Sequence, residues 1–201
     1  MNWSQAQINY LFIEYHCHMG KYDGPSRCSG GKDLTFRWFG YPQANESDDI
    51  QVATDKFIHM LEGPNRITNG YIGGMARAEF RKKVALAGKG QLWPVTGVAA
   101  VDKGNPPPLY EIRWQGITIR EDLGGGVIRD LSLIVRKYHS EPSEAPDYFI
   151  GHHVHEKDVS DREAISELQN VEILVAKRYF ELGLPTLWGI SKLTSGKKSI
   201  N

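Results

Sequence analysis

Three short runs of alternating apolar and polar residues, all within residues 108–158, constrain this 201-residue chain more than any other feature. They are Pro-Leu-Tyr-Glu-Ile-Arg-Trp at 108–114, Gly-Val-Ile-Arg-Asp-Leu-Ser-Leu-Ile-Val-Arg at 126–136, and Tyr-Phe-Ile-Gly-His-His-Val-His-Glu-Lys-Asp at 148–158. A period of two is typical of β-strands, in which alternate side chains point to opposite faces of a sheet. We therefore expect a sheet face that carries the basic residues Arg113, Arg129, His153, His155 and Lys157.

The rest of the sequence predicts a fold of the α+β class. Strands are expected at residues 34–41, 109–114, 117–121, 128–139 and 148–156. Apolar residues at helical spacing predict helices at residues 49–61, 74–87 and 161–182. Because short turns join the late strands, we expect a small antiparallel sheet. Its helices should cover one face and leave the basic face open.

Finer expectations concern the turns and the last helix. Three consecutive glycines at residues 124–126 are typical of a hairpin turn, and residues 91–108, rich in proline and glycine, are expected to form a loop. The inner stripe of the last helix should consist of its regularly spaced apolar residues, which are Ile165, Leu168, Val171, Leu174, Val175 and Tyr179.

The charge of the chain is balanced, with 24 Lys and Arg residues against 24 Asp and Glu residues. This balance argues against a general nucleic-acid binder, which is normally strongly basic. Basic residues gather locally in the second predicted helix, where Arg81, Lys82 and Lys83 are consecutive. Together with Arg136 they are candidates for binding RNA, although such a run is also typical of a solvated helix face.

The sequence favours a protein of the cytoplasm that makes no contact with a membrane. No stretch approaches the roughly 18 consecutive apolar residues of a membrane span. The first residues lack the basic and apolar regions of a signal peptide. The two cysteines, Cys17 and Cys28, are too few for a disulfide framework, and we expect both to be reduced.

The order and spacing of these motifs resemble the RelE/HigB superfamily of bacterial and phage toxins. Leu-Thr-Phe-Arg-Trp-Phe at 34–39 marks the beginning of the match, and Leu-Ala-Gly-Lys-Gly-Gln-Leu-Trp-Pro-Val at 86–95 is similar to the second helix and loop of the family. The three alternating runs are similar to its second, third and fourth strands. The resemblance implies a RelE-like core over residues 34–185, an N-terminal extension or linker at 1–33, and a C-terminal tail at 186–201.

The resemblance also implies an activity. A RelE-like chain would be an endoribonuclease toxin of a toxin–antitoxin system, which cleaves messenger RNA on the ribosome without a metal or other cofactor. A cognate antitoxin protein would hold it inactive. Arg113 and Arg129 fall where the family has phosphate-binding and transition-state-stabilising arginines, and the run at 153–157 falls where it often has a basic pair.

The residue types suit this chemistry. Cleavage of RNA without a metal requires a base for the 2′-hydroxyl, stabilisation of the phosphorane charge, and an acid for the 5′-oxygen. His153 or His155 could be base or acid, because histidine titrates near neutral pH. Arg113 and Arg129 can hold a phosphate through two parallel hydrogen bonds, and Lys157 could add charge at the developing oxyanion.

Other interpretations of the same residues remain. The balanced charge also suits a non-catalytic module of the same fold that binds nucleic acid or protein. The histidines at 152–155 could instead ligate zinc, with Asp158 nearby, in a metal-dependent hydrolase. A second possible zinc group, His16, Cys17, His18 and Cys28, lacks Cys-x-x-Cys spacing. Arg113 and Arg129 each have an acidic neighbour in sequence, so both could simply form salt bridges.

Overall fold

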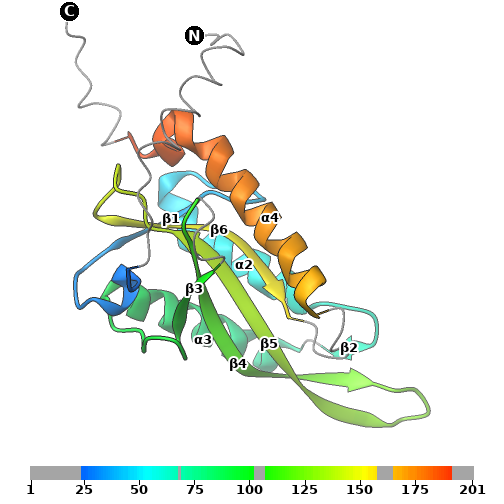
Figure 1. The fold of residues 1–201 in the computed structure, drawn as a ribbon. Helices are drawn as coiled ribbons and strands as arrows, with labels where there is room; N and C mark the ends of the chain where they lie inside the picture. Colours follow the sequence, from blue (N-terminus) through cyan, green and yellow to red (C-terminus); the bar gives the residue numbers. More distant parts are fainter. Residues whose placement is uncertain (1–23, 68, 102–106, 158–164, 192–201) are drawn as a thin grey trace, which may run out of the picture.

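A computed structural model describes residues 24–67, 69–101, 107–157 and 165–191 of the chain (Figure 1). The strands are β1 (Thr35–Trp38), β2 (Arg66–Ile67), β3 (Val98–Val101), β4 (Leu109–Asp122), β5 (Ile128–Ser140) and β6 (Tyr148–Glu156). The helices are α2 (Asp49–Leu61), α3 (Gly70–Gly88) and α4 (Ile165–Gly183), with short 3-10 helices at Arg27–Ser29, Glu46–Asp48 and Leu184–Gly189. The α+β class expected from the sequence is confirmed.

The strands form one mixed sheet in the order β1-β6-β5-β4-β2, and β3 also pairs with β4. β4, β5 and β6 pair antiparallel, as their short connections predict. β1 pairs in parallel with β6, so the expectation of a wholly antiparallel sheet is wrong. A parallel pair requires a long crossover connection, and here α2, α3 and the strands β3 to β5 all lie between the two partners in the chain.

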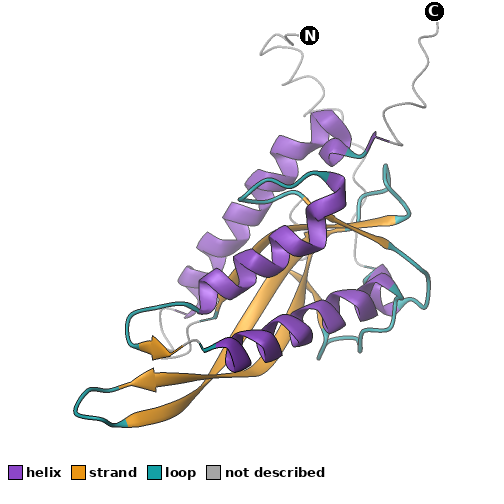
Figure 2. Cartoon of the chain, turned by 180° about the vertical axis from the view of Figure 1, so that it is seen from behind, coloured by secondary structure: helices purple, strands orange, loops and turns teal. Residues whose placement is uncertain are grey.

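Helices lie on both faces of the sheet (Figures 1 and 2). α2 and α3 cover one face and build the main core, in which the Phe80 ring stacks on Phe57 and on Trp114 of β4, with centroids 4.7 and 5.2 Å away. α4 crosses the other face over β5 and β6. The expectation that this second face stays uncovered is therefore wrong.

The side that α4 turns to the sheet also differs from the predicted stripe. Leu168, Val171 and Leu174 are 48%, 56% and 63% exposed, and Val175 and Tyr179 are only half-buried. The helix instead buries Ile173, Ala176 and Phe180. The predicted stripe is not buried because the strands that face α4 present mainly charged and polar side chains. They offer few apolar groups against which a long apolar stripe could pack.

Local signals explain most of the element boundaries. α2 has the expected bounds, whereas α3 begins at Gly70 rather than residue 74 because the Asn69 side chain caps it by accepting the Ile72 N–H at 2.9 Å. The strands expected at 109–114 and 117–121 are one strand, β4, with a register shift between Trp114 and Ile117. The loop expected at 91–108 contains β3, a strand that sequence patterning did not indicate.

The glycines at 124–126 form the predicted hairpin turn between β4 and β5. All three have positive φ, with values of 85°, 62° and 82°. Only glycine adopts such values without strain. The Leu123 and Val127 N–H groups close the turn by donating to Val127 and Gly124 carbonyl oxygens, at 2.9 and 3.1 Å.

Both ends of the described chain pack against the core. Cys28, expected in a linker, is fully buried in the main core and has a free thiol, whereas Cys17 lies outside the described residues. Trp188 and Ile190, expected in a tail, are buried beside Phe180 of α4. Within the described ranges, no helix is long and apolar enough to cross a membrane.

Candidate functional site

Six polar side chains form two rows across the sheet face beneath α4, and we call them the α4-face cluster. The first row is Glu111, Tyr138 and His153, and the second row is Arg113, Arg136 and His155. In each of the three strands the two members are two residues apart, so strand alternation directs both to the same face. Tyr138 packs against Ile173 of α4, which identifies that face. Of the five basic residues predicted to share a face, Arg113, His153 and His155 do so in this register, whereas Arg129, seven positions from Arg136 on β5, is directed to the opposite face.

Glu111 lies between the two arginines of the second row. Arg113 Nε donates to Glu111 Oε1 at 2.6 Å, whereas Arg136 Nε lies 3.4 Å from Glu111 Oε2 and makes no hydrogen bond with it. Burial lowers the pKa of Arg136, although a guanidinium keeps its charge in a protein. Arg136 Nε therefore has an ion-pair partner but no hydrogen bond, and a buried charged donor without a hydrogen bond is costly.

His155 is held as a neutral ring next to these arginines. Its Nδ1 lies 3.0 Å from the carbonyl oxygen of Glu156, and because a carbonyl only accepts, we assign the proton to Nδ1. Nε2 is then an acceptor, and the Tyr138 hydroxyl donates to it at 3.1 Å. Burial is the main cause that lowers the pKa of His155, to about 4. At neutral pH its Nε2 is therefore an unprotonated base.

His153 joins the cluster to α4. Its Nε2 is hydrogen-bonded to the Glu172 carboxylate, and this bond is the main cause that lowers the pKa of Glu172. The His153 and His155 rings stack with centroids 5.9 Å apart. A cavity of about 350 Å³ adjoins the cluster between β4 and α4, and Glu111, Arg113 and Gln169 are among the residues that line it.

The structure separates Arg129 from this cluster. Arg129 lies at the far end of the β4–β5 hairpin, where its side chain is 57% exposed and its Nε donates to Glu121 at 2.9 Å. It is seven residues from Arg136 on β5, or about 23 Å at 3.3 Å per residue. Lys157 directly follows β6, and its backbone N–H donates to Ile134 at 2.7 Å. The arginine next to His155 is thus Arg136, which the sequence placed only among RNA-binding candidates.

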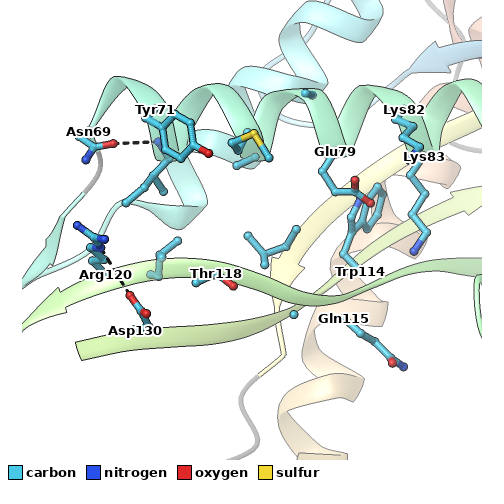
Figure 3. A pocket seen from close by; sticks show the side chains of 17 residues that line it. Asn69, Tyr71, Glu79, Lys82, Lys83, Trp114, Gln115, Thr118, Arg120 and Asp130 are labelled. Atoms are coloured by element: carbon cyan, nitrogen blue, oxygen red, sulfur yellow. Dashed lines mark hydrogen bonds and ion pairs between the residues drawn. The ribbon is translucent and has the colours of Figure 1, made fainter. Parts of the chain in front are cut away.

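The three consecutive basic residues of α3 belong to the opposite side of the sheet. Arg81 donates to the side chain of Gln51, and Lys83 donates to the carbonyl oxygen of Arg113. Burial lowers the pKa of Lys83. Lys82 and Lys83 line one end of a groove of about 620 Å³ between α3 and β4 (Figure 3). The three RNA-binding candidates of α3 therefore do not form one surface with the fourth, Arg136.

The histidines do not converge as zinc ligands would. His153 and His155 nitrogens face different partners, and Asp158 lies outside the described residues, as do His16, Cys17 and His18. His152 is buried at a separate place, where its Nδ1 lies 3.1 Å from the Phe39 carbonyl oxygen and its Nε2 lies 2.8 Å from Ser140 Oγ. His152 is thus a packing residue of the fold.

The buried His152 makes the stability of the fold depend on pH. Burial lowers its pKa to about 3 in the folded protein, whereas an unfolded histidine titrates near 6.5. Between these values the unfolded state binds more protons, so the free energy of unfolding falls as the pH falls. From pH 7 to pH 5 we expect this residue to contribute a loss of about 2 kcal/mol.

Urea unfolding of the wild type and of His152→Asn at both pH values measures this contribution. Asparagine can keep a hydrogen bond to the Phe39 carbonyl and does not titrate. The variant should lose about 2 kcal/mol less than the wild type between pH 7 and pH 5. Equal losses in the two proteins would contradict the assignment.

Comparison with protein-family models, curated proteins and solved structures finds no match to this chain. The functional inference therefore depends on the chain's own residues. Sequence reasoning missed Glu111, Tyr138 and Glu172 as members or partners of the site. Glu111 and Tyr138 could have been found from the period of two in their strands, whereas the contact of Glu172 with His153 depends on how α4 is docked.

Proposed function

We propose that this protein is a metal-independent endoribonuclease toxin of the RelE/HigB type, and that the α4-face cluster is its active site. The order of β1, two helices, the antiparallel strands β4 to β6 and a final helix supports the proposal, because the resemblance implies the same order. The observation that carries it is the buried Nε of Arg136, which makes no hydrogen bond, in the same row as the unprotonated Nε2 of His155.

In the proposed reaction, Arg113 and Arg136 bind the scissile phosphate of RNA in place of Glu111. His155 Nε2 takes the proton of the 2′-hydroxyl, whose oxygen attacks phosphorus while the bond to the 5′-oxygen breaks. His153 gives a proton to the leaving 5′-oxygen, and Glu172 balances the charge of its protonated ring. The arginines stabilise the phosphorane, and the bound phosphate favours protonation of His155 during the reaction.

The cellular part of the proposal rests on the resemblance alone. It places the reaction on the ribosome in the cytoplasm, with messenger RNA as the substrate and a cognate antitoxin as the inhibitor. A second candidate is a non-catalytic module, which is favoured by one observation. Glu111 already neutralises part of the charge of Arg113 and Arg136, so the cluster is less basic than its arginines suggest.

The chemistry of the RNA ends tests the proposal. Purified protein is added to ribosomes programmed with a defined messenger RNA, and the products are mapped. We expect a 2′,3′-cyclic phosphate and a 5′-hydroxyl, and a 2′-deoxy substitution at the cleaved nucleotide should abolish the cut. Products with a 3′-hydroxyl and a 5′-phosphate would contradict the proposed mechanism. Binding of RNA without any cleavage would favour the module.

A further inference from the structure

A second cluster of reactive side chains lies on the other side of β5, away from the α4-face cluster. Cys28 comes from the 3-10 helix Arg27–Ser29, His139 from the end of β5, and Glu141 from the connection that follows. All three are buried, with relative exposures of 0%, 0% and 1%. Thiol, imidazole and carboxylate are the three side-chain types that zinc binds in proteins.

The donor atoms already lie at distances suited to a shared metal ion. Cys28 Sγ is 3.6 Å from His139 Nε2, and His139 Nε2 is 3.0 Å from Glu141 Oε1. The three donors lie within 4.8 Å of one another. In a tetrahedral zinc site, bonds of about 2.3 Å to sulfur and about 2.0–2.1 Å to nitrogen or oxygen place neighbouring ligand atoms about 3.3–3.6 Å apart.

Neighbouring groups fix the orientation of each donor. The Arg27 backbone N–H donates to Glu141 Oε2 at 2.6 Å. The Ser26 hydroxyl donates to Oε1 at 2.5 Å, and His139 Nε2 lies 3.0 Å from the same oxygen. The Cys28 N–H donates to Ser26 Oγ at 3.1 Å. The His139 ring stacks on Tyr110, with centroids 5.7 Å apart. Groups of this kind, which hold ligands in place, are typical of protein metal sites.

We propose that Cys28, His139 and Glu141 bind a structural zinc ion that fastens residues 24–33 to the end of the sheet. A zinc ion would balance the thiolate and the carboxylate in a place that water does not reach. Two cationic side chains lie close to these donors. Arg27 Nε is 3.4 Å from Glu141 Oε2, and the buried amine of Lys137 lies over the Phe36 and Phe149 rings. The zinc proposal is independent of the proposed ribonuclease activity, because it is tested by the metal content of the protein and not by RNA cleavage.

The metal content of the purified full chain tests this site. We expect about one zinc ion per chain in the wild type and less than about a tenth in Cys28→Ser and His139→Gln. His59→Gln, at an exposed position on α2, is the matched control for His139→Gln and should keep its zinc. With cobalt in place of zinc, the wild type should show a sulfur-to-cobalt charge-transfer band, which Cys28→Ser removes and His59→Gln retains.

A measurement on the wild type alone covers the case in which the variants do not fold. The protein is unfolded in guanidinium with a chelator, freed of metal, and refolded with or without zinc. We expect bound zinc, and a higher Tm, only in the sample that was refolded with zinc. A wild type that contains no metal after refolding with zinc, and whose Tm is the same in both samples, would overturn the proposal.

Discussion

Replacing His155 by asparagine is expected to slow RNA cleavage by a factor of about 100 to 10,000. The substitution removes the unprotonated Nε2 that we propose as the base, and it keeps a polar side chain beside the Glu156 carbonyl that His155 contacts. The measurement is the single-turnover cleavage rate on programmed ribosomes with protein in excess, so that changes in binding do not hide the chemical step.

Two further variants separate loss of the base from loss of the fold. His59 lies on α2 with its side chain 79% exposed, so His59→Asn should cleave at the wild-type rate. Tyr138→Phe removes the hydroxyl that donates to His155 Nε2, and it should give a smaller loss than His155→Asn. If His155→Asn is folded, binds the ribosome and cleaves at the rate of the His59 control, then His155 is not the base.

Replacing Asp49 by alanine is expected to destabilise the fold by about 3–5 kcal/mol. Asp49 Oδ1 accepts hydrogen bonds from Arg37 Nη1 at 2.6 Å and from the Trp38 N–H at 2.9 Å. Both members of the ion pair are buried, with side-chain exposures of 6% and 8%. Alanine would leave the Arg37 guanidinium buried without this partner, at the contact between β1 and the start of α2.

The matched control for Asp49 is a second aspartate of the same helix. Asp55 pairs with Arg77 at the surface, where the two side chains are 51% and 40% exposed. Asp55→Ala should therefore cost less than about 1 kcal/mol. Urea unfolding at pH 7 measures both variants. A loss for Asp49→Ala as small as that of Asp55→Ala would show that the buried pair adds little to the stability of the fold.

Long periodic segments of the sequence predicted the fold best. The bounds of α2 agree with its pattern because burial on one side imposes a regular spacing of apolar residues. The bounds of β6 also agree, although this strand is buried on both faces. β3 is only Val98–Val101 and lacks alternation, so its pairing with β4 decides its structure. The parallel pairing of β1 with β6 is a contact between distant segments, which no local pattern specifies.

The candidate site was predictable only where it depends on strand alternation. The common face of Arg113, His153 and His155 follows from their spacing and from antiparallel pairing. The same rule separates Arg129 from Arg136, because the two positions differ by seven, and an odd difference in a regular strand directs side chains to opposite faces. The position of Glu172 depends on the docking of α4. The strands beneath this helix present polar side chains, so α4 does not face the sheet with its predicted apolar stripe.

The most direct test of the proposed activity is induced expression in a bacterial host, with growth and transcript ends recorded together. The strains carry the wild type, His155→Asn, Arg136→Lys or Arg129→Ala, and the solubility and fold of each protein are checked. We predict growth arrest and new messenger-RNA ends for the wild type and Arg129→Ala, and neither for the two cluster variants. Normal growth with intact transcripts from folded wild type would contradict the proposed function, and loss of cleavage in Arg129→Ala alone would contradict the proposed site.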